Sequence, residues 1–203
     1  MEFRQIRLAS VGGEHLAGLG DPRAMGWLGR VLAKSHHPDV LVESYVLAAP
    51  QEPIEAMSYR WEEEALPRFS NDTENRLLIA LNSSDTKYVP TSARARLNLA
   101  NIIDKATQQG LEVFVVGPLP GLDQDANQKL RELNAAYRNV AQRRNVFYVD
   151  VFEALVDHTQ YQQDLASNQG LPGQSAYGLV AWLVLHRGWY RWMNLPENLG
   201  SQS

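Results

Sequence analysis

The sequence predicts an α/β protein of three layers, in which helices cover both faces of a doubly wound, five-stranded parallel sheet. Three observations favour this class: β-prone runs alternate with longer runs of helical spacing, one central run is almost entirely apolar, and neither a linker nor an internal repeat interrupts the pattern. The chain has 203 residues, of which 44% are hydrophobic and 21% charged, an ordinary globular composition. We expect residues 1–193 to form a single domain, followed by a C-terminal tail, 194–203.

Five segments are predicted as strands because β-branched, aromatic and aliphatic residues dominate them. In chain order they are Ile6–Val11, Val40–Leu47, Arg76–Leu81, Glu112–Val116 and Asn145–Val149. The fourth is nearly all apolar, as expected for a parallel strand that is buried on both faces.

The segments between these strands have the spacing of amphipathic helices. Within Ile54–Leu66, the side chains of Met57, Trp61 and Ala65 fall on one stripe, which we expect to pack in the core. Further helices are expected at Met25–Lys34, from a cap at Thr91 or Ser92 to Gly110, at Asp123–Arg144 and at Gly173–His186. An aromatic tail, Gly188–Met193, follows, and its tryptophans are expected to pack rather than to line a groove.

The charge distribution and composition exclude several classes of function. The formal net charge is −4 and the basic residues are scattered, so we expect no nucleic-acid partner. No apolar run approaches the ~20 residues of a membrane span, and the start lacks the core of a signal peptide, so we expect a cytoplasmic protein without a membrane partner. Cysteine is absent. His36-His37 is expected to be a solvated helix end, and we expect no metal and no cofactor.

Standard catalytic signatures are absent from the sequence. There is no G-x-S-x-G elbow, no H-E-x-x-H and no Walker lysine. Gly18-Leu19-Gly20 begins like a dinucleotide fingerprint, but Arg23 stands where the third glycine is needed. In open α/β sheets ligands bind beyond the carboxyl ends of the strands, so the loops after the first, second, third and fifth strands are the candidate site.

One group of stretches does point to a family. The chain reads Val-Gly-Gly-Glu-His-Leu-Ala-Gly-Leu-Gly-Asp-Pro over residues 11–22 and Gly-Trp-Leu-Gly-Arg over 26–30. This resembles block I of the SGNH (GDSL) hydrolases, where a strand ends in G-D-S and continues into G-x-G-D-P and G-W-x-G-R. Further stretches resemble the family in the same order: Arg60–Ala65, Leu81–Thr86, Val116–Pro120, and Asn168–Pro172 with Tyr177. The resemblance implies the flavodoxin-like SGNH hydrolase fold.

SGNH hydrolases cleave esters and thioesters with a serine nucleophile, a histidine base and an aspartate, and amide donors hold the oxyanion. The resemblance places other residue types at these positions. Gly13 and Glu14 stand where the family has the aspartate and serine of G-D-S, and Gln51 falls at the glycine of block II. Ser84, Asn168 and Leu171 stand at the oxyanion asparagine, the triad aspartate and the triad histidine.

A leucine cannot accept a proton, so we do not expect hydrolysis by the family mechanism. We expect a catalytically degenerate member that binds a small ligand in the former active-site cleft or acts as a partner protein. The expected cleft residues are Gly13, Glu14, His15, Gln51, Ser83, Ser84, Asp85, Asn168 and Leu171.

Glu14 itself leaves alternatives open. We expect it just past a strand, at a helix N-terminus, where its carboxylate is stabilised. There it could act as the general base of a different reaction, with Ser84 and Asp85 as companions, or it could merely bind amides left from the oxyanion site. Esterase activity through residues that the pattern does not reveal is the other alternative.

Overall fold

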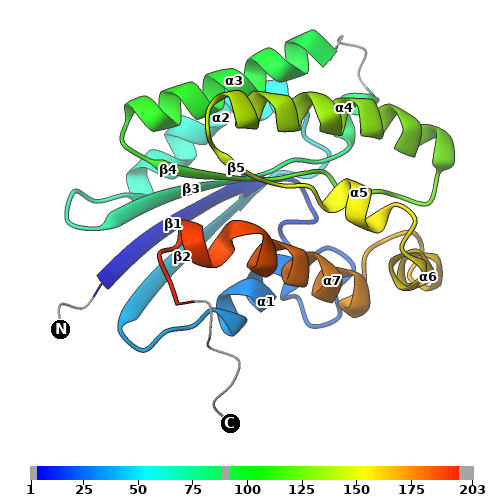
Figure 1. Ribbon diagram of the computed structural model, residues 1–203, viewed down its shortest axis with the longest axis horizontal. Coiled ribbons are helices and arrows are strands. Elements are labelled where there is room, and N and C mark those ends of the chain that lie inside the picture. The colour runs from blue at the N-terminus through cyan, green and yellow to red at the C-terminus, as the bar shows by residue number, and fades with distance from the viewer. Residues whose placement is uncertain (1–3, 88–91, 197–203) are drawn as a thin grey trace.

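The computed structural model describes residues 4–87 and 92–196, in which strands and helices alternate along the chain (Figure 1). All strand pairs are parallel, and the order across the sheet is β2-β1-β3-β4-β5. The strands are β1 (Arg4–Gly12), β2 (Val40–Ala48), β3 (Glu74–Ala80), β4 (Glu112–Val116) and β5 (Phe147–Val149). The strands β2 and β3 lie on opposite sides of β1, so the connection from β1 to β2 runs one way across the sheet and the connection from β2 to β3 runs the other way. The topological switch point therefore lies beside the carboxyl end of β1.

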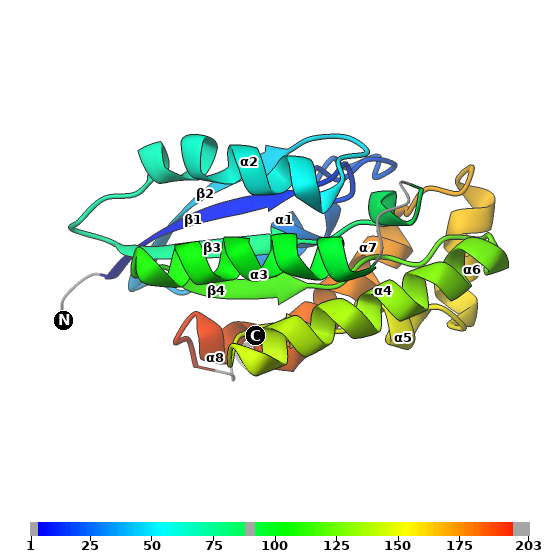
Figure 2. The same cartoon turned by 90° about the horizontal axis from the view of Figure 1, so that it is seen from above.

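Helices cover both faces of this sheet, which confirms the predicted three-layer fold. One face carries α2 (Ile54–Ala65), α3 (Ser92–Gln108) and α4 (Gln124–Arg143), which lie along the strands in Figure 2. The other face carries α1 (Gly26–Lys34) and α7 (Gln174–Val184), and α8 (Tyr190–Trp192) follows α7 along the chain. Helix α5 (Val151–Leu155) lies beyond the end of β5, and α6 (Thr159–Ser167) lies beyond the carboxyl ends of the strands, next to α7.

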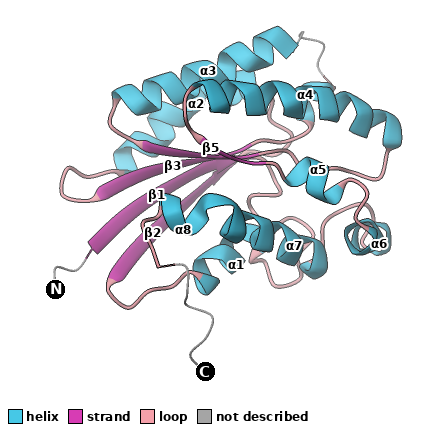
Figure 3. Ribbon diagram, viewed as in Figure 1, coloured by secondary structure: helices cyan, strands magenta, loops and turns pink. Residues whose placement is uncertain are grey.

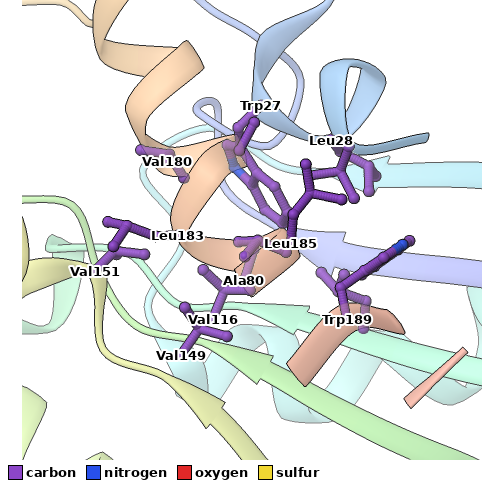
Figure 4. Close-up of a cluster of buried hydrophobic side chains, with 14 of the residues drawn as sticks. Trp27, Leu28, Ala80, Val116, Val149, Val151, Val180, Leu183, Leu185 and Trp189 are labelled. Atoms are coloured by element: carbon purple, nitrogen blue, oxygen red, sulfur yellow. The ribbon is translucent and has the colours of Figure 1, made fainter. Parts of the chain in front are cut away.

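Each face has its own apolar core. Trp61, with Met57 and Ala65 beside it, is fully buried between α2 and the sheet, as the stripe predicts. On the opposite face Trp27 of α1 packs among residues of α7 and the strands (Figure 4). Both indoles belong to the core, so they are unavailable for a binding groove.

The aromatic C-terminal segment also packs, as expected. After α7 a π-type turn, Leu185–Trp189, is interrupted at Gly188, which has a φ of +124°. Trp189 and Trp192 both pack on Phe114 of β4, with ring centroids 5.9 and 4.8 Å away. The indole of Trp189 donates a hydrogen bond to Ser35 Oγ at 2.9 Å, which ties this segment to the end of α1.

Two short helices, α5 and α6, are not among the predicted elements. Each begins at a side-chain cap: Asp150 accepts a hydrogen bond from the Glu153 amide at 3.0 Å, and His158 accepts one from the Tyr161 amide at 3.4 Å. The predicted start of the last strand is wrong, because Asn145 has a φ of +53° and belongs to the turn after α4. Thr91, one of the two caps considered for α3, lies outside the described residues.

No helix within residues 4–87 and 92–196 is long and apolar enough to cross a membrane.

Candidate functional site

The carboxyl ends of β1 and β3 approach each other so closely that only glycine fits between them. A Cβ on Gly12 would lie 2.9 Å from Cβ of Ala80, and a Cβ on Gly13 would lie 3.0 Å from Nδ2 of Asn82. These glycines set the start of the loop that follows β1. They also place Glu14 beside the loops after β2 and β3, at the predicted edge of the sheet.

Glu14 lies in a turn, which corrects the expectation that it begins a helix. The Leu16 amide donates to the Gly13 carbonyl at 3.0 Å, the Leu19 amide donates to the Glu14 carbonyl at 3.1 Å, and the first helix begins only at Gly26. The expected stabilisation by a helix dipole is therefore absent, because no helix axis ends at this carboxylate.

The carboxylate of Glu14 is held by the loop after β2. Its Oε2 accepts a hydrogen bond from the backbone amide of Gln51 at 2.8 Å. Gln51 has a φ of +52°, a left-handed conformation that favours glycine. This conformation fits the alignment of Gln51 with a glycine, and the hydrogen bond fits the alternative in which Glu14 binds a backbone amide.

The loop after β3 is organised by Asn82, a residue that the sequence analysis does not single out. Its Nδ2 donates to the Glu52 carbonyl at 2.8 Å, and its Oδ1 accepts from the Ser84 amide at 2.8 Å. Asn82 and Ser84 are both buried, and Ser83 is half-buried. Asn82 thereby joins the loops after β2 and β3 next to Gly13.

Asp85 is a helix cap rather than a companion of Glu14. Its carboxylate accepts from the Ile54 amide at 3.0 and 3.2 Å, at the start of α2, and from the Tyr137 hydroxyl at 3.0 Å. Burial raises the pKa of Asp85 despite these donors. These contacts assign Asp85 a structural role behind the loops.

The loop before α7 is tied to the turn that follows Glu14. Asn168 Nδ2 donates to the carbonyls of Gly20 at 3.0 Å and Leu171 at 3.1 Å. Gly20 has a φ of +92°, and a Cβ there would lie 2.8 Å from Cβ of Leu171. The Tyr177 hydroxyl donates to the Leu19 carbonyl at 2.7 Å. Leu171 and Asn168 are thus anchored at the same end of the sheet as Glu14, through the 14–20 turn.

His15 follows Glu14 without pairing with it. Burial lowers the pKa of His15, while the nearby Glu14 charge opposes that change. Its Nδ1 has no hydrogen-bond partner among the described residues. No hydrogen bond therefore joins the side chains of Glu14 and His15 within the described residues.

The other histidines lie elsewhere. His36 and His37 follow the end of α1, His158 caps α6, and His186 stacks on Trp182 at a centroid distance of 4.3 Å. Within residues 4–87 and 92–196, no hydrogen bond joins a histidine to a serine or threonine hydroxyl. The same residues contain no cluster of His, Asp and Glu that could hold a metal ion.

Two buried ion pairs explain the stretches that carry the family resemblance. Asp21 accepts hydrogen bonds from Arg30 and from the Gly26 amide at 2.9 Å, so it fixes the loop that enters α1. Arg30, helped by backbone amides, lowers the pKa of Asp21 to about 2. The pair joins the Gly-x-Gly-Asp-Pro and Gly-Trp-x-Gly-Arg stretches, so its role is structural.

Arg60 forms the second pair, with Glu52 at 2.6 Å, and also donates to the Leu47 carbonyl at 3.1 Å. It therefore holds α2 against the carboxyl end of β2. The sequence analysis assigns no role to Glu52. The only feature of the sequence that indicates this pair is Arg60, eight residues later on α2.

The structure of this chain is similar to solved structures over most of its length, although no curated sequence matches it. A search of curated protein sequences finds no significant match. The structure is similar to an acetylxylan esterase from Geobacillus stearothermophilus (14% identity, TM-score 0.74, 100% of both chains). It is also similar to a lipase/acylhydrolase from Enterococcus faecalis (17% identity, TM-score 0.67, 93% of this chain and 96% of that one). A G-D-S-L family lipolytic protein from Veillonella parvula has 19% identity and a TM-score of 0.64 over 89% of this chain and 96% of that one.

At these identities the solved structures establish the fold. The family follows from a separate finding: the model of the GDSL-like lipase/acylhydrolase family matches residues 10–186, which is most of the chain and includes every loop described above. The chain therefore belongs to the GDSL-like lipase/acylhydrolase family.

Proposed function

We propose that this chain is a non-hydrolytic member of its family that binds a small molecule at the carboxyl edge of the sheet. The observation that carries the proposal is the hydrogen bond from the Gln51 amide to the Glu14 carboxylate at 2.8 Å. The Glu14 carboxylate thus accepts a hydrogen bond from the Gln51 amide, the donor that the oxyanion of an ester substrate would need.

The first supporting argument concerns the oxyanion. Acyl transfer needs donors that point at the oxygen on which negative charge develops. At Gln51 that donor already serves a carboxylate, and a substrate carbonyl would have to displace a charged acceptor with a neutral one. Charge-assisted hydrogen bonds are about twice as strong as neutral ones, so this exchange is unfavourable.

The second argument concerns the base. Leu171 lies against Gly20, and its aliphatic side chain accepts no proton. His15 is the histidine nearest in sequence to Glu14, but it makes no hydrogen bond to a described hydroxyl. In serine hydrolases the loss of a triad member costs on the order of 10⁴-fold or more in kcat, which supports a protein without esterase turnover.

The same loops suit recognition of a polar ligand. Glu14 keeps a second carboxylate oxygen, Oε1, for which no hydrogen bond is formed with the described residues. Ser83 lies half-buried on the neighbouring loop. A carboxylate oxygen that is free to accept hydrogen bonds favours a cationic or hydroxyl-bearing small molecule.

An assay with p-nitrophenyl acetate and p-nitrophenyl butyrate tests the non-hydrolytic part. We expect the native chain and a Glu14→Ala variant to release nitrophenol at the same rate, close to buffer alone. Turnover of the native chain far above that of the variant would overturn the proposal in favour of an enzyme that uses Glu14.

Thermal shift with a panel of small amines and polyols tests the binding part. A compound that binds should raise the Tm of the native chain and leave that of Glu14→Gln unchanged. Glu63→Gln, an exposed change on α2, is the matched control and should respond like the native chain. A panel that shifts all three proteins equally, or none of them, would contradict a ligand site at Glu14.

A further inference from the structure

Strand β2 forms one border of the sheet and has an open edge. It contributes nine residues, Val40–Ala48, and pairs only with β1 among the described strands. Figure 3 shows it as the outermost strand next to β1. It contains neither proline nor glycine, and its only charged residue is Glu43. Proteins commonly protect an edge strand with proline, bulges or exposed charges, and this strand lacks those devices.

The one charge on the strand is already neutralised within the chain. Glu43 lies 3.4 Å from Arg7 of β1, and the Tyr45 hydroxyl donates to Glu43 Oε2 at 2.7 Å. Glu43 therefore does little to repel a second strand.

The backbone groups that face outward can be identified from the pairing with β1. The Asp39 carbonyl accepts from the Arg4 amide at 3.1 Å, and the Ala49 amide donates to the Gly12 carbonyl at 2.9 Å. Both residues are odd-numbered and face β1, so by alternation the backbone groups of Val42, Ser44 and Val46 point away from it. These groups are the ones available to another strand.

Apolar side chains along the strand are also uncovered. Leu41 and Val46 are 45% and 47% exposed, although their neighbours Val42 and Leu47 pack partly on the two cores. Exposed aliphatic residues on both faces of an edge strand are typical of an interaction surface.

The sequence of the strand is symmetric about Ser44. From that residue outward it reads Tyr-Val-Leu-Ala in one direction and Glu-Val-Leu-Val in the other. In an antiparallel pair of two copies, Val42 would face Val46 of the second copy, and Leu41 would face Leu47 of the second copy. Ser44 would face its own copy on the two-fold axis, and Glu43 would face a tyrosine rather than another glutamate. Outside these central positions, apolar residues meet apolar residues across the two strands, an arrangement that stabilises sheets.

The free backbone groups fit this same register. In antiparallel sheets residues whose backbone groups face each other exchange two hydrogen bonds as a pair. Val42, Ser44 and Val46 have outward groups, and the symmetric register pairs these residues with one another. A shift by one residue would oppose outward groups to inward ones. Backbone alternation therefore excludes shifts by an odd number of residues, and the sequence symmetry selects the register about Ser44 among those that remain.

We propose that two copies of this chain associate through antiparallel pairing of β2 about Ser44, forming one continuous sheet across a two-fold axis. In a closed, isologous interface of this kind, the open β2 edge of each copy is covered by the β2 edge of the other. The loops at the carboxyl ends of the strands take no part in the pairing.

Cysteine cross-linking tests the register, since the chain has no cysteine of its own. In the full chain Ser44→Cys places two sulfurs opposite each other, at a Cα separation of about 5.5 Å, within disulfide range. Val46→Cys is the matched control, because the two copies of residue 46 would lie ~14 Å apart along the strands. We expect a covalent dimer under mild oxidation with Ser44→Cys and none with Val46→Cys. Cross-linking of both or of Val46→Cys alone would overturn the proposed register.

The mass in solution tests the interface itself. Light scattering over a concentration series should show a dimer for the native chain and a monomer for Ser44→Lys, in which two lysines meet on the axis. Ser44 is exposed, so this variant should keep the native Tm. Ser175→Lys, an exposed change on α7, should remain dimeric. A native chain that stays monomeric throughout, or a Ser44→Lys variant that stays dimeric, would overturn the proposal.

Discussion

At the scale of single residues, Gln51 has a strained backbone conformation, and its backbone amide donates a hydrogen bond to Glu14. Its φ of +52° is a conformation in which side chains other than glycine are strained, yet its amide holds Glu14. Gln51→Gly should relieve the strain, keep the amide and raise the free energy of unfolding by about 0.5 kcal/mol. Gln51→Val should lower it by more than ~1 kcal/mol, because β-branched residues fit this conformation poorly. Urea unfolding checks both, and a loss of stability in the glycine variant would contradict the strain argument.

Asp21 predicts a response to acid at a single carboxylate. Its pKa in the folded chain, about 2, is below the ordinary value of 3.8, so the unfolded chain takes up this proton first. The stability that Asp21 contributes is therefore present above pH 3.8 and is lost as the pH falls through about 2. Asp21→Asn should cost about 3 kcal/mol at neutral pH, since it leaves Arg30 without its buried anion.

The measurement for Asp21 is a series of urea unfolding curves at several pH values. The gap in unfolding free energy between Asp21→Asn and the native chain should narrow as the pH falls from 4 to 2. Asp72→Asn, an exposed surface change, should follow the native chain throughout. A gap that stays constant with pH would show that the charge of Asp21 is unimportant.

At the scale of elements, Gly188 controls how the C-terminal segment returns to the sheet. It has a φ of +124°, and a Cβ there would lie 2.7 Å from the Phe147 ring. Gly110 also has a positive φ, +75°, but a Cβ there would meet nothing within 4 Å. Gly110→Ala should therefore cost only the conformational term of about 1 kcal/mol, and Gly188→Ala at least ~2 kcal/mol. Thermal unfolding of both variants checks the difference. An equal loss of stability in the two variants would mean that the Phe147 ring moves away from the added methyl group without a loss of stability.

The elements that the sequence predicts well are those with a long apolar pattern. In α2 and β4 the spacing of the apolar residues predicts which side chains are buried. Both elements lie where they are predicted. The helices α5 and α6 have five and nine residues and depend on side-chain caps, so periodicity is a weak signal there. Asp150 followed by Glu153 three residues later is a capping pattern that would have indicated α5.

The sequence predicts where the loops of the candidate site lie, but not their detailed geometry. The order of motifs along the chain locates the loops, because the carboxyl ends of parallel strands share one edge. It does not give the path of the chain after β1, where Gly18 and Gly20 take positive φ values and keep residues 14–20 in turns. Nor does it reveal that Asn82 joins two of the loops, since an asparagine's partners depend on tertiary contacts.

At the scale of the whole molecule, the scaffold still holds the carboxyl-edge loops in a fixed relation. Tyr177 and Asn168 attach the last loop to the turn after Glu14, and Asn82 attaches the loop after β3 to the loop after β2. If the proposed loss of hydrolysis lies only in residue types, then restoring those types on this scaffold should restore some chemistry.

The combined variant Glu14→Ser, Ser84→Asn, Asn168→Asp, Leu171→His tests this prediction. We expect it to hydrolyse p-nitrophenyl acetate about tenfold or more faster than Glu14→Ser, Ser84→Asn, which lacks a base. The gain should come with a loss of about 1–2 kcal/mol in unfolding free energy, because an aspartate cannot donate to the Gly20 and Leu171 carbonyls as Asn168 does. If the combined variant folds but hydrolyses the ester no faster than its control, then the loops do not hold these side chains at the distances that hydrolysis needs. The protein would then differ from active hydrolases in the backbone of its loops as well as in its side chains.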